Sequence, residues 1–165
     1  MKNGTMKDLL IEELRDIYNA EKQLTKALPR LARAASNQKL KQAFEAHKEE
    51  TEGQIARLEQ VFEKLETRAR GKLCHAMEGL VEEARDIMEK DFPPELKDAA
   101  LIAAAQKVEH YEIASYGTVH AYAQAIGERD VANLLEETLK EERATDEKLN
   151  RLAIDDVNKK AIKAA

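Results

Sequence analysis

Apolar side chains recur every three or four positions along most of this chain, the spacing that places them on one face of an α-helix. Four long stretches show the pattern: residues 5–35, residues 38–67, a third that follows Pro94 and ends near residue 126, and a fourth that follows Asp130. A shorter stretch at residues 74–90 lies between the second and the third. The pattern therefore predicts an all-α protein with four long helices and one short one.

Residues that cap or interrupt helices separate these stretches. Ser36 and Asn37 form the first corner, and Gly127 follows the third helix at a position that favours left-handed backbone. Asp130 is expected to cap the fourth helix, because its side chain can accept a hydrogen bond from a free amide of the first turn. Pro29 lies inside the first helix, where a missing amide donor favours a bend.

The lengths of the connections predict how the helices are arranged. The two short corners make the first two helices antiparallel, and likewise the last two, whereas residues 68–94 are long enough to travel the length of a bundle. This connectivity predicts a ferritin-like four-helix bundle with the short helix in the crossover, built as a single domain of residues 1–165. An up-and-down array of five equal helices is the alternative that the pattern leaves open.

Each long helix carries acidic or histidine side chains in the middle of its otherwise apolar seam. Glu21 lies about fifteen residues before the first corner and Glu50 about thirteen after it, so at a rise near 1.5 Å per residue they are almost level. Glu112 and Glu142 repeat this arrangement around the second corner. The residues expected to share one layer near mid-bundle are Glu21, His47, Glu50, Glu109, Glu112, Glu142 and Asp146.

A buried layer of this composition predicts a metal centre. Removing a carboxylate from water without a partner costs several kcal/mol, and the seams contain no Lys or Arg at this level. Six carboxylates and one imidazole suit two iron ions, with manganese as the alternative. The competing interpretation places these residues at the edges of their seams, where they reach solvent. Di-iron bundles usually carry Glu-x-x-His, whereas this chain has His47-x-x-Glu50 and Glu142-x-x-x-Asp146, so the individual ligands of these two helices stay open.

Two tyrosines and a histidine near this layer are candidates for hydrogen bonds to the expected metal ligands. Tyr18 and Tyr116 lie one turn from Glu21 and Glu112, where each hydroxyl either bonds a ligand or forms the polar tip of a core side chain. His110 is either a partner of a ligand or an exposed imidazole.

Composition and charge exclude several classes of function. The formal net charge of −5 and a pI near 5.5 provide no overall attraction for nucleic acid or anionic lipid, and Lys159, Lys160 and Lys163 are expected to form a solvated helix end. No segment resembles a signal peptide or approaches about 20 apolar residues, so a soluble, cytoplasmic protein without membrane contact is expected. A single cysteine, Cys74, cannot form an intrachain disulfide and is expected to be structural.

Several stretches of this chain closely resemble the YciF/YciE family of bacterial ferritin-like stress proteins. The stretches are residues 18–23 (YNAEKQ), 47–51 (HKEET), 74–80 (CHAMEGL) and 103–117, which contains QKVEHYE. The resemblance spans nearly the whole chain. It implies a rubrerythrin-like helical fold, a homodimer, a two-metal site and expression under osmotic or related stress.

Three functions are compatible with a metal layer of this kind. The first is an oxidoreductase, in which a reduced di-iron or di-manganese centre reacts with a small oxidant, either hydrogen peroxide or dioxygen. The second is a non-enzymatic stress protein whose metal site is structural or vestigial. The third, iron storage, requires a closed shell of subunits. Metal content and the consumption of oxidant separate the first two.

Overall fold

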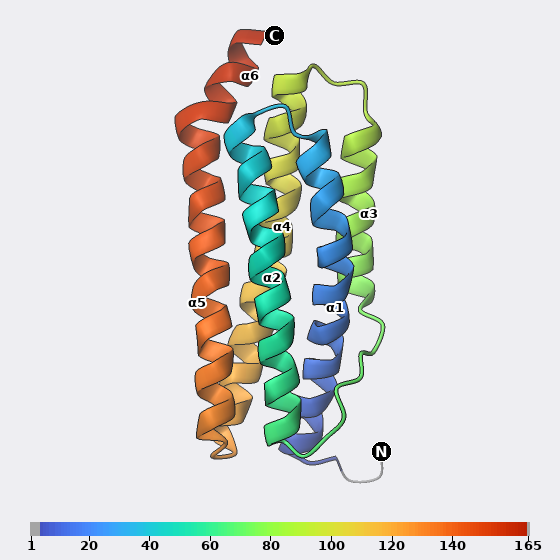
Figure 1. The fold of residues 1–165 in the computed structure, drawn as a ribbon, viewed down its shortest axis with the longest axis vertical. Helices are drawn as coiled ribbons and strands as arrows, with labels where there is room; N and C mark the ends of the chain where they lie inside the picture. Colours follow the sequence, from blue (N-terminus) through green and yellow to red (C-terminus); the bar gives the residue numbers. More distant parts are fainter. Residues whose placement is uncertain (1–3, 165) are drawn as a thin grey trace.

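The computed structural model describes residues 4–164, which form a bundle of long helices (Figure 1). The helices are α1 (Met6–Ala34), α2 (Gln38–Lys64), α3 (His75–Glu89), α4 (Pro94–Ala125) and α5 (Arg129–Leu152). The chain continues through a π-helical turn, η1 (Ala153–Val157), into the short helix α6 (Asn158–Ala164). The predicted all-α fold is confirmed, and the second helix ends three residues earlier than its apolar pattern suggested.

Side chains at the helix ends explain why most of the elements begin and stop where they do. Thr5 forms a capping box with Asp8, because each accepts a hydrogen bond from the backbone amide of the other. Asn37 accepts hydrogen bonds from the first amides of α2. Gly127 has a φ of 80°, as its position after α4 predicted. The expected cap at Asp130 is wrong: α5 begins at Arg129, so Asp130 lies within the first turn, where its charge still favours the positive end of the helix dipole.

The arrangement of the helices is that of a four-helix bundle with an added crossover helix. α1 pairs with α2, α4 pairs with α5, and the two pairs meet through α1 against α4 and α2 against α5. α3 packs against α1 and α4, and it lies outside the bundle along one side (Figure 1). This placement excludes the alternative of five equal helices for the described residues and confirms the ferritin-like connectivity.

Two apolar clusters fill the interior, one on each side of the level of Glu21 and His47. One cluster joins the later half of α1 to α3 and the early half of α4, with Leu28, Phe44 and Leu101 in its centre. The other fills the opposite end of the bundle between α1, α2, α4 and α5. The polar layer is therefore enclosed along the bundle axis by packed apolar side chains.

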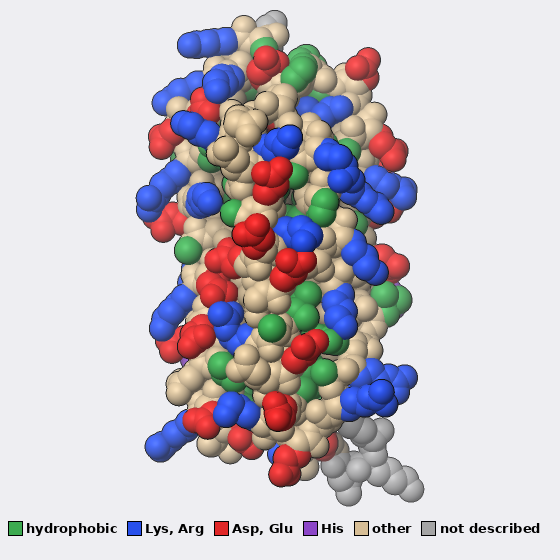
Figure 2. Space-filling model, viewed as in Figure 1, with side chains coloured by type: hydrophobic (Ala, Val, Ile, Leu, Met, Phe, Trp, Pro, Cys, Tyr) green, Lys and Arg blue, Asp and Glu red, His purple; other side chains and the backbone are tan. Residues whose placement is uncertain are grey.

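The outer surface carries both signs of charge. Figure 2 shows Lys and Arg side chains interspersed with Asp and Glu over the face formed by α1, α2 and α5. Lys159, Lys160 and Lys163 are exposed on α6, as expected, and Lys160 pairs with Asp156. Within residues 4–164, no helix combines the length and the apolar character needed to cross a membrane.

One buried carboxylate holds the corner between α1 and α2 against α4. Asp98 is 3% exposed and accepts hydrogen bonds from the amides of Ser36 and Asn37, both at 2.8 Å, and from the Ser36 hydroxyl at 2.5 Å. We predict that Asp98→Ala lowers the free energy of unfolding by roughly 3 kcal/mol, because it leaves these donors without an acceptor. Urea denaturation measures the change. Asp86→Ala, at an exposed position of α3, is the matched control and should change stability by less than about 0.5 kcal/mol.

Candidate metal centre

All four helices of the bundle direct a buried acid or histidine to one point. His47 of α2, Glu109 and Glu112 of α4 and Glu142 of α5 each present one atom, nitrogen or oxygen, and these atoms all lie within 4.8 Å of one another. Glu21 of α1 is fully buried and faces Glu112. These five residues are referred to below as the carboxylate–histidine cluster. Sequence periodicity placed all five on the correct face of their helices.

The hydrogen bonds within the cluster leave most of its oxygens unsatisfied. The hydroxyl of Tyr116 donates to Glu21 Oε1, so of the two roles that the sequence left open for Tyr116, the hydrogen bond to a predicted ligand is the one observed. Seven carboxylate oxygens have no hydrogen-bond donor: one from Glu21 and both from Glu109, Glu112 and Glu142. The Nε2 atom of His47 also has no hydrogen-bond partner. A folded protein rarely leaves buried polar atoms unpaired, so this group of atoms requires protons or cations.

Burial changes the pKa of each residue in the cluster. Loss of solvent raises the pKa of Glu21 to about 7, although the hydrogen bond from Tyr116 acts in the opposite direction. Burial, together with the charge of Glu21, raises the pKa of Glu109 to about 8. The pKa values of Glu112 and Glu142 lie well above the usual range for the same two reasons.

His47 is shifted in the opposite direction from the acids. Burial lowers the pKa of its imidazole to about 4, so the ring is neutral at pH 7. Its Nδ1 atom lies 3.4 Å from Glu109 Oε1, and its Nε2 atom lies 3.9 Å from Glu142 Oε2. A neutral ring leaves one nitrogen lone pair available, which is the form in which histidine binds metals.

Two of the expected ligands lie outside the inner group. Glu50 is half-buried and accepts a hydrogen bond from the Thr145 hydroxyl at 3.2 Å, and burial raises its pKa. The Asp146 side chain is 23% exposed and lies 3.2 Å from the exposed ring of His110. Both carboxylates therefore have partners of their own at the margin of the cluster. A direct bond from either to a metal stays a prediction.

The remaining residues singled out in the sequence have structural partners. The hydroxyl of Tyr18 donates a hydrogen bond to Glu59 at 2.8 Å and not to a residue of the cluster. The ring of Tyr18 packs edge-on against Phe62. Cys74 is buried as the N-cap of α3, and its sulfur lies 3.0 Å from the hydroxyl of Tyr111. The expectation that Cys74 is structural agrees with these contacts.

A charged pair close to the cluster was not predicted from the sequence. Arg57 of α2 donates two hydrogen bonds to Glu141 of α5, at 2.9 and 2.8 Å, and one to Thr138 at 2.7 Å. Gln54, one turn before Arg57, is buried and also donates to Glu141. Neither Arg57 nor Glu141 lies on an apolar seam, so periodicity did not mark them. Their equal height along two neighbouring helices is the one signal that could have indicated the contact.

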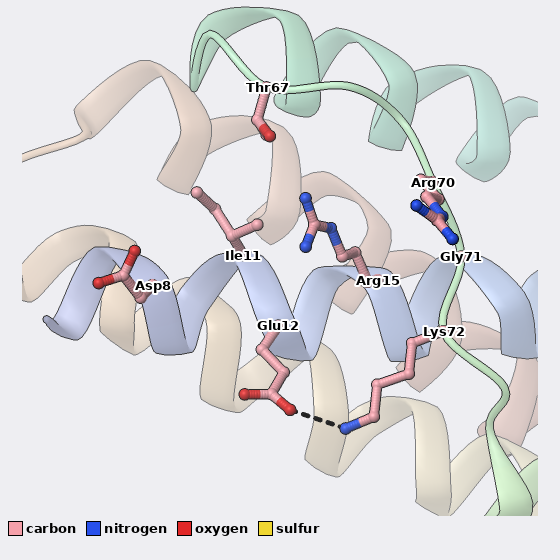
Figure 3. A pocket seen from close by; sticks show the side chains of 8 residues that line it. All are labelled: Asp8, Ile11, Glu12, Arg15, Thr67, Arg70, Gly71 and Lys72. Atoms are coloured by element: carbon pink, nitrogen blue, oxygen red, sulfur yellow. Dashed lines mark hydrogen bonds and ion pairs between the residues drawn. The ribbon is translucent and has the colours of Figure 1, made fainter. Parts of the chain in front are cut away.

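A recess in the described surface belongs to another part of the molecule. It has a volume of about 560 Å³ and lies between the first half of α1 and the loop that follows α2 (Figure 3). Arg15, Arg70 and Lys72 line it, and Lys72 pairs with Glu12 at 2.8 Å. None of its lining residues belongs to the carboxylate–histidine cluster. The recess marks the place where the loop crosses α1, tied by a hydrogen bond from the Lys72 amide to the Arg15 carbonyl.

Comparisons with known proteins give a consistent result. Residues 5–162 match the family described as a domain of unknown function (DUF892). Protein YciF of Escherichia coli is 58% identical over 162 residues, which are 98% of each chain. The crystal structure of this E. coli stress protein superposes with a TM-score of 0.91 over 95% of this chain and 99% of that one, at 57% identity. YcfI from Rhodopseudomonas palustris, called a structural protein, gives a TM-score of 0.87 at 48% identity over 89% of this chain and 94% of that one.

The raised pKa values of the cluster predict how the stability of the metal-free protein depends on pH. The folded chain binds protons at Glu21 and Glu109 near pH 7 and 8, whereas both groups ordinarily titrate near 4.5. Protonation of these two carboxyl groups stabilises the folded chain fully below pH 4.5. This stabilisation is lost as the pH rises through 7 and 8. His47 has the opposite effect below pH 6.5, because its folded pKa is depressed.

We therefore predict that the metal-free protein melts roughly 5 °C higher at pH 6.5 than at pH 8. Differential scanning calorimetry in the presence of a chelator measures both values. Equal melting temperatures at the two pH values would mean that the carboxyls of the cluster are as well solvated in the folded chain as in the unfolded one.

Proposed function

The chain belongs to the YciF stress-protein family, described as DUF892, and from this premise we propose that its carboxylate–histidine cluster binds two metal ions, iron or manganese. The proposed function is redox chemistry at this centre, with hydrogen peroxide or dioxygen as the oxidant. The proposal includes the two marginal carboxylates, Glu50 and Asp146, as candidates for additional ligands.

One observation supports the proposal above all others. Seven carboxylate oxygens and one imidazole nitrogen without hydrogen-bond partners lie in the interior of the bundle. A structural role for the acids would be better served by apolar side chains of similar size, since buried charge costs stability unless it is compensated. Cations compensate several carboxylates at once and favour their ionised forms.

The chemistry of the donors indicates which metals fit. Carboxylate oxygens with one imidazole nitrogen suit iron and manganese, whereas structural zinc sites usually contain thiolates. The one thiol of the chain, Cys74, is held by Tyr111 and takes no part in the cluster. The neutral state of His47 leaves its ring ready to bind without first losing a proton.

The residues around the centre determine how it would react. The cluster residues would hold a ferrous pair that, when bound, would supply the two electrons needed to reduce H₂O₂ and two H⁺ to two H₂O, or O₂ and two H⁺ to H₂O₂, leaving two Fe³⁺. Tyr116 fixes Glu21 through its hydrogen bond and keeps that carboxylate turned toward the cluster. The two apolar clusters exclude bulk water from both ends of the layer.

A structural role for the metal is the second candidate. His47 is the single imidazole of the inner group, and Glu50 and Asp146 are engaged by Thr145 and His110. This set is poorer in nitrogen than the usual di-iron pattern of two Glu-x-x-His motifs. The metal would then join four helices without turnover, and its binding energy would add to the stability of the fold.

We predict that the protein binds about two ferrous or manganous ions per chain and that Glu112→Gln and Glu142→Gln each lose at least one of them. The amide keeps the size of the side chain but removes its charge, so the metal-free variants should melt no lower than the wild type. Metal analysis after gel filtration and a thermal melt of each variant provide the two readouts.

Glu49→Gln is the matched control for these variants. Glu49 is exposed on the outer face of α2, so its replacement should leave both the metal content and the melting temperature unchanged. Metal content near zero in the wild type after loading with either ion would contradict the proposal.

Turnover separates the two candidate functions. We predict that the ferrous protein under anaerobic conditions oxidises its iron when hydrogen peroxide or dioxygen is added, at least about tenfold faster than the Glu142→Gln protein with the same total iron. Stopped-flow absorbance in the near ultraviolet follows the ferric product. Tight metal binding with no difference between the two rates would favour the structural role.

A further inference from the structure

The sides of the bundle around the cluster differ in polarity. The side formed by α2 and α5 is polar, because Arg57 and Glu141 pair across it and Thr145 bonds Glu50. The side formed by α4 and α5 carries Asp146 beside His110. Charged and hydroxyl groups therefore flank the cluster on both of these sides.

The side between α1 and α4 is apolar, and α3 covers it. A narrow crevice under α3 leads to His47 and Glu109 at its inner end. Its walls consist otherwise of apolar side chains from three helices: Leu24, Ala27, Leu28, Leu31, Leu80, Val81, Ala84, Ala104, Ala105 and Val108. The interior volume open to a water-sized molecule is only about 10 Å³.

Residues of α3 form one wall of this crevice. α3 packs on α1 and α4, and Ala84 is its buried contact with the crevice. Leu80 and Val81, on the same helix, are only partly buried, and the crevice is partly open to solvent. Alanines from α1, α3 and α4 leave the space that larger side chains would fill.

We propose that this crevice is the entry passage through which dioxygen, in preference to hydrogen peroxide, reaches the carboxylate–histidine cluster. The proposal rests on the proposed function and names its oxidant. Dioxygen makes no strong hydrogen bonds in water and loses none in an apolar passage. Hydrogen peroxide donates two hydrogen bonds, and removing a polar group from water without replacing its hydrogen bonds costs a few kcal/mol. The small volume of the crevice also excludes larger substrates.

The first test uses dissolved dioxygen as a paramagnetic probe of the metal-free protein. Under several atmospheres of the gas, methyl NMR should show faster relaxation for Leu28 and Val108, which line the crevice, than for Leu10 and Val61. Leu10 and Val61 are equally deep but lie in the other apolar cluster. Equal relaxation at the two sets of methyl groups would overturn the proposal.

A matched pair of variants then tests whether filling the crevice blocks the entry of dioxygen. Ala84→Leu places a larger side chain inside the crevice, whereas Ala76→Leu makes the same change at an exposed position of α3. Ala84→Leu should remove the excess relaxation at Leu28 and Val108, and Ala76→Leu should leave it as in the wild type. Loss of the effect in both variants would indicate a general change of α3 and would contradict a specific passage.

The second test uses the ferrous protein and two oxidants. Ala84→Leu should slow oxidation by dioxygen about tenfold while leaving oxidation by hydrogen peroxide and the metal content unchanged, and Ala76→Leu should change neither rate. Equal slowing with both oxidants would overturn the proposed selectivity. Absence of iron oxidation in the wild type would overturn the proposed function, and the relaxation data would still decide whether the crevice admits the gas.

Discussion

The cost of placing four glutamates and a histidine inside an apolar bundle is the constraint on which this structure depends. Each ionised carboxylate in the cluster repels its neighbours and has lost its water, which explains the raised pKa values of Glu21 and Glu109. The helices nonetheless converge on this point, and Tyr116 donates a hydrogen bond to one carboxylate of the cluster, that of Glu21. Such an arrangement is stable when cations balance the charge, so the fold and the proposed metal centre are parts of one energetic problem.

The rest of the architecture compensates for this polar layer. Apolar clusters on both sides of the layer provide the hydrophobic stabilisation that the middle of the bundle lacks. The corner held by Asp98 and the ion pair between Arg57 and Glu141 fix the helices relative to one another outside the layer. α3 adds an apolar cover on one side, and the same cover creates the crevice that leads to His47 and Glu109.

Much of this could be predicted from the sequence, because helical periodicity determines which side chains face inward. Periodicity placed His47 on the inward face of its helix, and His47 is buried together with Thr51 and Gln54, the polar side chains that follow it on the same face. Periodicity does not determine how far a side chain at the edge of a seam turns toward solvent, so it could not separate Glu50 and Asp146 from the inner group. The pairing of Arg57 with Glu141 and the crevice under α3 depend on contacts between helices, which a single-helix pattern does not contain.

Locating bound metal in a crystal structure decides whether the carboxylate–histidine cluster is a metal centre. Crystals grown with ferrous or manganous ions and measured at the absorption edge of the metal would give an anomalous difference map. We expect two strong peaks between His47, Glu109, Glu112 and Glu142, at distances of about 2.0–2.2 Å from their oxygen and nitrogen atoms. A map from fully loaded protein with no peak among these side chains, or with peaks confined to surface carboxylates, would contradict it.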